Sequence, residues 1–490
     1  MIKDINTVKD SFLDADVCII GTGAAGITLG LELANSGKKV IMLESGSMQK
    51  TQVSQSFYDL ENTNLAIDPN SRIRAFGGTT TVWGGGWKPL DPIDFEQRDW
   101  VPFSGWPMTR ETLSPYYERA AKVFSGPALE TFDVQNVSKF SKNNYILDTN
   151  NVKTTFLRIL PHEKWDFAKN YQKLFEQSAS VDVFFNAPVT KIVLDNKHQK
   201  VSELLVQTVL GKKFNIRAGY YVVACGGIEN ARLLLFSDVG NQNDQVGRYY
   251  MDHPKFVSGN VMLKTRDLNL SLYWKPQNIN GLAIAGLQLS EDVQRNLGVL
   301  NSYVHFLPGY VSDQYAFLAL KVFASNNVLS KTFRALMRFY TGISKVQVRN
   351  FMEQTPSPEN RISLSDRKDM FDNPLAKVEW SLSALDKQSL FALHTVLKKE
   401  LEQSGVGRLA SPICEHTETF ASIRDASHHM GTTRMGGDPR YSVVDENCKV
   451  HSIDNLFVAG SSVFPTSGHA NPTATIIALT IRLADHLKSS

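Results

Sequence analysis

The sequence has few cysteines and little net charge for its length, and it lacks any long apolar run. Its four cysteines, Cys18, Cys225, Cys414 and Cys448, have spacings that fit neither a disulfide framework nor a metal site. A net charge of +3 over 490 residues argues against a dedicated nucleic-acid-binding protein. No apolar run is long enough to cross a bilayer, and the polar stretch from Met1 to Asp16 contains no signal-peptide core. We therefore expect a cytoplasmic protein that binds no metal and no nucleic acid and has no transmembrane segment.

The first fifty residues carry the pattern around which the chain is organised. A short apolar run, Asp16 to Ile20, reads as a buried strand and leads into Gly21-Thr22-Gly23-Ala24-Ala25-Gly26. Apolar residues at helical spacing run from Ile27 to Ser36, and a second strand, Lys39 to Leu43, ends in the acid Glu44. Strand, G-x-G-x-x-G, helix, strand and an acid about 20 residues on form the fingerprint of a dinucleotide-binding fold.

Each position of this fingerprint has a physical role. Gly21 permits the tight turn, Gly23 lets the backbone approach a pyrophosphate, and Gly26 lets helix and strand pack closely. The helix N-terminus presents free N–H groups and a partial positive charge to phosphate. Glu44 can accept hydrogen bonds from a ribose diol. The fingerprint alone leaves open whether the dinucleotide is FAD or NAD.

Two further stretches are rich in glycine. The run from Phe76 to Trp87 places glycines beside small hydroxyl residues, which indicates backbone pressed against a flat ligand. A predicted strand, Phe214 to Val223, ends in Ala224-Cys225-Gly226-Gly227 and leads into a predicted helix, Ile228 to Phe236. The second stretch therefore repeats the strand–glycine–helix pattern. Residues 49–74 are polar, and we expect them to be irregular.

The hydrophobic pattern of the sequence changes after about residue 255. Alternating stretches such as Gly259–Leu263, Leu282–Leu289 and Val299–Phe306 predict an antiparallel sheet with one open face. Asp386 to Gln403 is predicted to be a helix. The basic, amphipathic stretch Leu329–Tyr340 is interpreted as a solvated helix face, with contact to a membrane surface or a partner as the alternative.

The C-terminal segment returns to the first pattern. Asn455 to Gly460 reads as a strand ending in glycine, and an amphipathic helix follows from Pro472 to about Leu487. Because the chain is too long for one compact core, we expect two domains in an α/β fold, α+β overall. The predicted division is a discontinuous dinucleotide domain, 1–254 and 425–490, with excursions near 49–75 and 94–180, and a second domain, 255–424.

Six stretches, taken in order, resemble the glucose–methanol–choline (GMC) oxidoreductases. They are GTGAAG…LESG, FGGTTTVWGGGW, VVACGGIENARLLL, VGRYYMDHP, HHMGTTRMGG and NLFVAGSSVFPTSGHANPTATI, and they extend from Gly21 to Ile476. The GG-T-T-T-x-W-GG and HxMGTxRMG forms are most similar to the branch of pyranose oxidases and sugar dehydrogenases. The resemblance implies a Rossmann-type FAD-binding domain and a substrate domain built on an antiparallel sheet with helices. It also implies oxidation of an alcohol group of a sugar, glycoside or cyclitol by hydride transfer to flavin N5.

The resemblance also implies which residues contact FAD. In pyranose oxidase a histidine in the GG-x-S-T-H-W segment is bonded covalently to the flavin, and Val82 occupies that position here. We therefore expect FAD to be bound non-covalently. The residues assigned to the cofactor are Gly21, Gly23, Ala24, Ala25, Gly26, Glu44, Ser45, Gly77, Gly78, Thr79, Val82, Trp83, Gly84, Val189, Cys225, Gly226, Gly460, Ser461, Asn471, Pro472 and Thr473.

Oxidation of an alcohol by hydride transfer requires a general base for the hydroxyl proton, and histidine suits this task near neutral pH. In the family the first residue of HxMGT is the catalytic histidine, which places the base at His428. The family's partner position is Asn471, which can hold the substrate hydroxyl. His469 is a candidate for the edge of the substrate pocket, and His429 is interpreted as structural.

The helix expected from Pro472 has a second role. Its N-terminus carries partial positive charge, which would stabilise the anionic reduced flavin near N1 and the C2 carbonyl. Asn471 followed by Pro472 also reads as an N-cap and first-turn pair, so Asn471 has a structural interpretation beside the catalytic one.

Three alternatives remain open from the sequence. Some relatives on this fold use FAD only as structure and cleave cyanohydrins. The first fingerprint alone would also fit an NAD-dependent dehydrogenase, and the alcohol need not belong to a sugar. No residue separates an oxidase from a dehydrogenase, so the electron acceptor is unknown.

Overall fold

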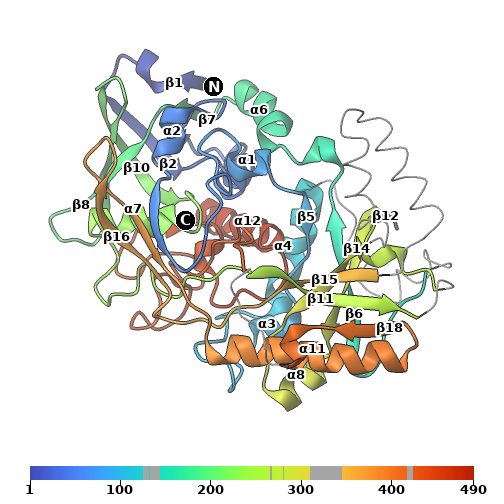
Figure 1. Cartoon of the computed structure of the whole chain (residues 1–490). Helices are drawn as coiled ribbons and strands as arrows, with labels where there is room; N and C mark the ends of the chain where they lie inside the picture. The colour runs from blue at the N-terminus through green and yellow to red at the C-terminus, as the bar shows by residue number, and fades with distance from the viewer. Residues whose placement is uncertain (125–131, 133–143, 265–267, 280, 310–344, 416–422) are drawn as a thin grey trace, which may run out of the picture.

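The computed structural model describes residues 1–490 except 125–131, 133–143, 265–267, 280, 310–344 and 416–422. Figure 1 shows two regions side by side, one built on a mostly parallel sheet and the other on an antiparallel sheet. The basic stretch Leu329–Tyr340 lies outside the described residues.

The first sheet contains the dinucleotide fingerprint. Its order is β1-β7-β3-β2-β10-β9-β8, with β19 beside β10, and only the β10–β9 and β9–β8 pairs are antiparallel. Val17 to Ile20 and Val40 to Leu43 are buried, as expected for parallel strands covered on both faces. The strands are β1 (Ile2–Asp4), β2 (Phe12–Ile20), β3 (Val40–Leu43), β7 (Val181–Phe185), β8 (Val189–Leu194), β9 (Val201–Gln207), β10 (Lys213–Val223) and β19 (Leu456–Val458).

Helices from both ends of the chain pack together against this sheet. The helix α1 (Ala24–Leu33) contacts α12 (Thr473–Ser489), and α12 contacts α4 (Arg110–Val123). Leu29, Ile477 and Ile481 belong to one buried core with the central strands. The N- and C-terminal segments therefore form one unit, as Figure 1 shows by the blue and red helices. Two further helices of this region are α6 (Phe167–Gln177) and α7 (Glu229–Ser237).

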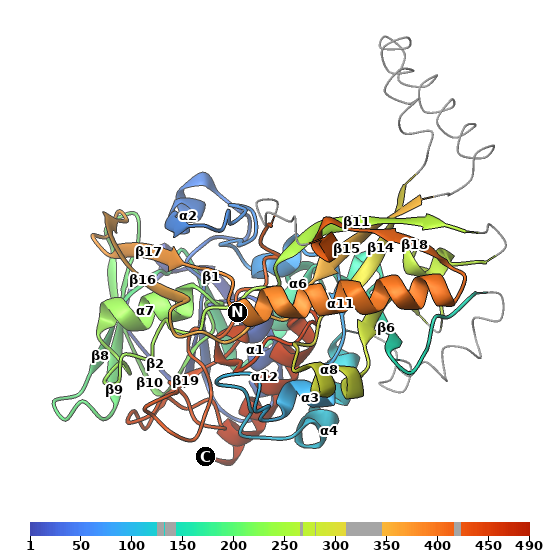
Figure 2. The ribbon, with the colours of Figure 1, turned by 60° about the horizontal axis from the view of Figure 1, so that its bottom comes forward.

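The second sheet is antiparallel, which confirms the expected strand pattern. Its order is β18-β11-β15-β14-β13-β6-β5, with β12 beside β13. The helix α11 (Ala384–Gln403) lies along it (Figure 2), and Leu393, Leu397 and Leu401 share a core with Val261 and Val304 of the strands. The strands are β5 (Gly86–Trp87), β6 (Val152–Ile159), β11 (Lys255–Leu263), β12 (Gln277–Asn278), β13 (Leu282–Leu289), β14 (Tyr303–Gly309), β15 (Lys345–Phe351) and β18 (Gly407–Ala410).

Two groups of strands pair in a sheet other than the one that the predicted division into domains implies. The strands β5 and β6 come from residues before 160 but pair in the second sheet. In the opposite sense, β16 (Arg361–Lys368) and β17 (Pro374–Glu379) form a small sheet with β4 (Leu60–Thr63) and contact α7. The division into domains at residues 254 and 425 remains a prediction, and the chain crosses between the two regions more often than the division implies.

The stretch 49–74 is not wholly irregular, which corrects the expectation from its polar composition. It contains α2 (Gln52–Ser56), where Thr51 and Ser54 form a reciprocal capping box, and it contains β4. A strand of polar sequence such as Leu-Glu-Asn-Thr is specified by its partner strand β17 rather than by its own periodicity.

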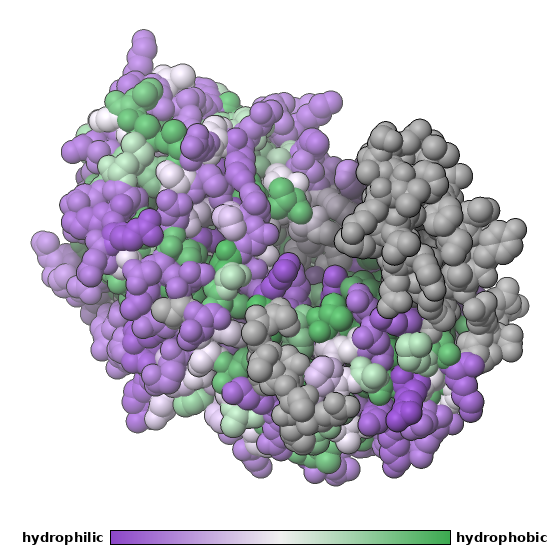
Figure 3. All heavy atoms as spheres, in the orientation of Figure 1, coloured by the Kyte–Doolittle hydropathy of each residue, from purple (hydrophilic) through white to green (hydrophobic). Residues whose placement is uncertain are grey.

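The short helix α8 (Glu291–Leu297) follows β13 of the second sheet, whereas Phe95 of the short helix α3 (Pro92–Phe95) belongs to the core of the first sheet. Among the described residues, no helix has the length and apolar character needed to cross a membrane. On the face shown in Figure 3, hydrophilic residues dominate and hydrophobic ones form small groups between them.

Candidate active site

One cavity, of about 720 Å³, lies at the carboxyl ends of β2, β3 and β10. Ligands of open α/β sheets bind at this edge. Gly26, Gly77 and His469 lie outside the cavity wall. The predicted residues that line it are Gly21, Gly23, Ala24, Ala25, Glu44, Ser45, Gly78, Thr79, Val82, Trp83, Gly84, Val189, Cys225, Gly226, His428, Gly460, Ser461, Asn471, Pro472 and Thr473.

The glycines of the site fall into two groups. Gly21 has φ of +103°, and a Cβ there would lie 2.6 Å from the carbonyl oxygen of Ala224. A Cβ on Gly26 would lie 2.0 Å from the carbonyl oxygen of Gly21, so packing alone requires glycine at both positions. A Cβ on Gly23 or Gly226, in contrast, would meet no protein atom within 4 Å. Gly23 and Gly226 therefore leave the backbone open to a ligand in the cavity.

Glu44 lies at the end of β3 with its carboxylate fully engaged by neighbouring donors. One carboxylate oxygen accepts hydrogen bonds from the backbone N–H and the hydroxyl of Thr22, at 3.1 and 2.6 Å. The other accepts from the backbone N–H of Gly46 at 2.8 Å. These bonds fix the acid at the cavity wall. Its contact with a ribose diol remains a prediction.

A buried basic cluster at the cavity was missed by the sequence reasoning. Arg72, Arg74 and Arg232 pair with the carboxylate of Glu229 at 3.1, 3.0 and 3.1 Å, and all four residues line the cavity. Burial raises the pKa of Glu229, but the three guanidinium groups outweigh this effect and lower it. The only sequence signal was the pair Arg72 and Arg74 just before the glycine-rich stretch, because Glu229 is brought to them by the fold.

The predicted base and its partner lie together. The Nε2 atom of His428 is 3.4 Å from the side-chain nitrogen of Asn471, and its Nδ1 atom is 2.9 Å from Nδ1 of His253. Loss of solvation lowers the pKa of His428 well below its usual value, and the nearby His253, Lys255 and His429 lower it further. A lowered pKa favours a neutral imidazole at the cavity wall, which is the form that a base requires. The role of His428 as the base remains a prediction. His253 belongs to the DHP stretch noted in the sequence, but no role was assigned to it.

The helix α12 begins at Thr473 with Pro472 as its N-cap, and no side chain caps it. The expectation that Asn471 caps this helix is therefore wrong, because its amide is directed at His428 instead. The uncapped first turn leaves N–H groups available at the cavity, where Pro472 and Thr473 form part of the wall.

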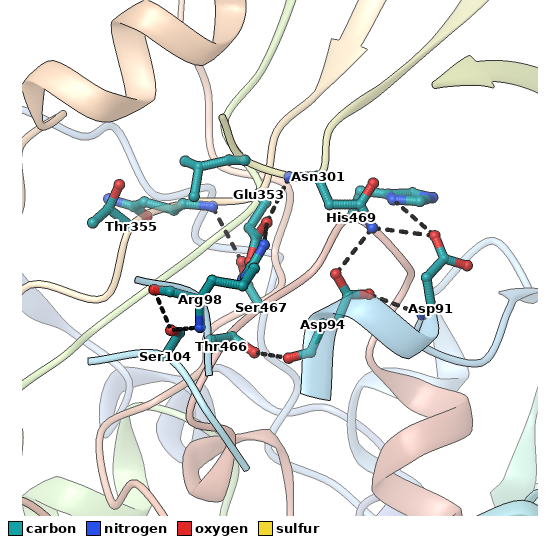
Figure 4. A network of polar contacts seen from close by, with 12 residues as sticks. Asp91, Asp94, Arg98, Ser104, Asn301, Glu353, Thr355, Thr466, Ser467 and His469 are labelled. Carbon is teal, nitrogen blue, oxygen red and sulfur yellow. Dashed lines mark hydrogen bonds and ion pairs between the residues drawn. The ribbon is translucent and has the colours of Figure 1, made fainter. Parts of the chain in front are cut away.

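His469 lies in the polar network of Figure 4 and does not line the cavity. Its Nε2 atom is 3.5 Å from the amine of Lys88, its Nδ1 atom is 3.7 Å from the carboxylate of Asp91, and its ring lies against Tyr303. Burial, and then the charge of Lys88, lower the pKa of His469 to about 3. These contacts account for His469 without a substrate, and its role at the pocket edge remains a prediction.

The same network joins the two regions of the molecule (Figure 4). The side chain of Asn301, just before β14, donates to Asp91 at 3.1 Å and to Asp94 at 2.9 Å. Its backbone N–H donates to Glu353 at 2.6 Å, and Glu353 pairs with Arg98 in a fully buried ion pair. Asp91, Asp94 and Arg98 belong to the segment around α3, whose Phe95 shares the core of the first sheet. Asn301 lies just before β14 and Glu353 just after β15 of the second sheet.

His429, adjacent to the predicted base, is buried among charged and aromatic groups. Its Nε2 atom lies 3.7 Å from the carboxylate of Asp425, and its ring stacks on Tyr250 with centroids 6.1 Å apart. His429 also lines the cavity, so its structural interpretation remains a prediction. The expectation that the chain binds no metal remains a prediction.

The family model described as GMC oxidoreductase matches the chain in two parts, an N-terminal part at residues 155–255 and a C-terminal part at 356–480. A model described as FAD binding domain matches residues 16–85. The chain belongs to the GMC oxidoreductase family. It is an FAD-dependent alcohol oxidoreductase, and its α/β architecture with an FAD-binding domain and a second sheet confirms the predicted fold class.

The similarity of this GMC oxidoreductase to several relatives covers almost the whole chain. It is 25% identical to 6'''-hydroxyparomomycin C oxidase of Streptomyces lividus, over 96% of this chain and 92% of that protein. It is 24% identical to the fructose dehydrogenase large subunit of Gluconobacter japonicus, over 98% of each chain. The crystal structure of pyridoxine 4-oxidase from Mesorbium loti is similar in fold, with a TM-score of 0.60 at 16% identity over 96% of this chain and 99% of that one.

The cavity of this GMC oxidoreductase fits FAD. No side chain caps α1, so the N–H groups of Ala24 and Ala25 can receive the pyrophosphate beside the open backbone of Gly23. Val82 lines the cavity and offers no nucleophile to the flavin. Non-covalent attachment remains the prediction.

Proposed function

We propose that this enzyme oxidises an alcohol group of a sugar, glycoside or cyclitol to a carbonyl, with His428 as the general base. The observation that carries the proposal is the pairing of His428 and Asn471 at the cavity wall, 3.4 Å apart, beside the N-terminus of α12. FAD, when bound, supplies the acceptor for the hydride that leaves the alcohol carbon.

His428 removes the hydroxyl proton. Its lowered pKa keeps the imidazole unprotonated at neutral pH, so that Nε2 can accept the proton as the C–H bond breaks. Asn471 is an amide that does not titrate, and its side-chain nitrogen is directed at the same Nε2 atom. Asn471 can therefore hold a substrate hydroxyl beside the base without competing for its proton.

The N-terminus of α12 stabilises negative charge at the same wall. Its first N–H groups have no side-chain partner, and the helix of 17 residues is long enough to carry a partial positive charge at this end. Aligned donors that are already in place need no reorganisation when charge develops, which is the usual source of electrostatic catalysis.

The choice of a carbohydrate is supported by the relatives and by the motif forms. The relatives that span nearly the whole chain include an oxidase of 6'''-hydroxyparomomycin C and a fructose dehydrogenase subunit. The two names also show that both oxidases and dehydrogenases occur among close relatives, so the proposal leaves the electron acceptor open.

The proposal is tested by anaerobic titration of the purified holoenzyme with sugars, glycosides, cyclitols and simple alcohols, with flavin absorbance as the readout. We expect at least one carbohydrate to bleach the flavin and to yield a carbonyl product. Bleaching by simple alcohols alone would contradict the substrate class. Cleavage of a cyanohydrin at equal rates by oxidised and dithionite-reduced enzyme would indicate a lyase instead.

A further inference from the structure

The base His428 is bonded to a second histidine whose own partner is a backbone carbonyl. The Nδ1 atoms of His428 and His253 are 2.9 Å apart, and the two rings meet nearly edge-on at 83°. The Nε2 atom of His253 lies 3.3 Å from the carbonyl oxygen of Ser467. The three groups form a continuous row, Ser467, His253 and His428, that ends at the cavity beside Asn471.

The carbonyl at the far end determines where each proton lies. A carbonyl oxygen only accepts, so Nε2 of His253 must carry a proton and donate it to Ser467. His253 is fully buried, and this burial lowers its pKa to about 4, so the neutral ring has no second proton and Nδ1 is bare. The proton between the two Nδ1 atoms must therefore belong to His428. Neutral His428 then has an unprotonated Nε2.

We propose that His253 is a positioning residue that holds His428 in the tautomer with its proton on Nδ1, so that Nε2 is free to act as the base. The role of Nε2 as the base rests on the proposed function. When Nε2 takes up the substrate proton, His428 becomes a cation that still donates from Nδ1 to neutral His253. A charged donor makes this bond stronger, so the bond to neutral His253 offsets part of the cost that burial imposes on the cation, and no second proton transfer is needed.

The backbone around the two histidines is fixed by one buried carboxylate. One oxygen of Asp252 accepts from the backbone N–H groups of His253, Ala426 and His428, at 2.6, 3.1 and 3.2 Å. These three bonds join the segment after β10 and α7 to the segment that carries the base. The backbones of the two histidines are therefore held in place relative to each other. A hydrogen bond between their rings can select a tautomer only if the distance between the rings is held in this way.

The carbonyl of Ser467 is held from the other side by the network of Figure 4. The Ser467 hydroxyl accepts from the backbone N–H of Gln354 at 3.1 Å, and the neighbouring Thr466 hydroxyl donates to the carbonyl of Asp94 at 2.7 Å. The acceptor that sets the tautomer is thus anchored to both regions of the molecule. A loop carbonyl without these bonds could turn away from His253.

The first experiment reads the tautomer directly in the holoenzyme without substrate. Histidine labelled with ¹⁵N is incorporated, long-range ¹H–¹⁵N spectra are recorded near neutral pH, and the signals are assigned with His428→Gln and His253→Gln. We expect His428 to be protonated on Nδ1 and His253 on Nε2. A proton on Nε2 of His428 would overturn the inference, whatever the enzyme oxidises. Failure of the carbohydrate titration with the expected spectrum would instead reject the proposed function alone.

The second experiment compares two variants of the positioning residue. His253→Gln keeps one acceptor and one donor, whereas His253→Phe fills the space and offers neither. We expect His253→Phe to slow flavin reduction by about 10²-fold or more, since a base in the wrong tautomer cannot take the proton. The KM should change far less, and His253→Gln should recover much of the rate.

The pH profile distinguishes positioning from a structural role. The groups that face His428 are His253, His429 and Lys255, together with the carboxylate of Asp252 that accepts from its backbone. We expect the acid limb of the reduction rate to move in His253→Phe and to stay near the wild-type position in His253→Gln. Equal rates and equal profiles in His253→Phe and wild type would overturn the inference. Should His253→Phe not fold, the spectrum of the wild type and the rate of His253→Gln decide it.

Discussion

At the scale of the single residue, Glu44 accepts hydrogen bonds from Thr22 and Gly46 and is also predicted to accept hydrogen bonds from the ribose of FAD. We predict that Glu44→Ala weakens FAD binding by roughly 1.5–3 kcal/mol, the usual loss for hydrogen bonds to a charged group. Equilibrium dialysis of the apoprotein against FAD measures the effect. Thr22→Val is the matched control, since it removes one hydroxyl donor to Glu44 and leaves the carboxylate in place. Equal FAD affinity in Glu44→Ala and wild type would contradict the assignment.

Single residues also show where sequence reasoning reached its limit. His428 and Asn471 could be placed from their motifs, because each motif is local and its spacing is diagnostic. His253 and Glu229 could not be assigned, because their partners are distant in sequence. The fold alone brings His428 to His253, and Arg72 and Arg74 to Glu229. His469 was assigned from its distance to Asn471 along the chain, yet its side chain turns into the network with Lys88 and Asp91.

At the scale of the element, the start of α1 carries two glycines with opposite expected effects, Gly23 at the N-cap and Gly26 in the first turn. In Gly26→Ala the new Cβ would lie 2.0 Å from the Gly21 carbonyl oxygen, so α1 cannot keep its packing against the turn. We predict that the free energy of unfolding of the apoprotein falls by about 1–3 kcal/mol or more, the usual cost of overpacking. Gly23→Ala meets no protein atom within 4 Å, so we predict an unchanged melting temperature of the apoprotein and weaker FAD binding. The reverse assignment of effects would contradict the roles given to the two glycines.

The elements were predicted best where one local signal sufficed. The apolar runs of β2, β3 and β10 and the helices α1, α7, α11 and α12 follow from hydrophobic period and glycine boundaries. Thr109 caps α4, and a hydroxyl residue before a helix is a local signal of the same kind. The strand β4 and the membership of β5 and β6 in the second sheet were not predicted, because pairing with distant strands decides them.

At the scale of the whole molecule, a buried ion pair joins the two regions. Arg98 Nη1 lies 2.9 Å from Glu353, and both side chains are fully buried. We predict that Arg98→Met lowers the stability by about 3–5 kcal/mol, because it leaves an unpaired buried carboxylate. Arg98→Met combined with Glu353→Gln should be less unstable than Arg98→Met alone in urea unfolding, since the amide removes the charge and still accepts from Asn301. A double variant at least as unstable as the single one would contradict this role.

Asp94 makes the junction sensitive to pH. Burial, and then the charges of Glu353 and Asp91, raise its pKa to about 8, against about 3.9 for an unfolded aspartate. The folded protein therefore binds a proton that the unfolded chain releases, so Asp94 contributes stability below about pH 4 that is lost as the pH rises toward 8. We predict that the melting temperature of wild type, relative to Asp94→Asn, falls between pH 5 and pH 8. A difference that stays constant or grows with pH would show that Asp94 is ionised throughout.

The most direct measurement of the proposed chemistry is stopped-flow reduction of the flavin under anaerobic conditions, with a carbohydrate that bleaches the wild type. Removal of a general base typically costs about 10²–10⁴-fold, so we expect His428→Ala to slow reduction by this factor while its FAD content stays close to that of wild type. Because the pKa of His428 lies well below its usual value, the wild-type rate should stay level near neutral pH and fall only in more acidic solution. Reduction of His428→Ala at the wild-type rate, with the same dependence on pH, would show that His428 is not the base.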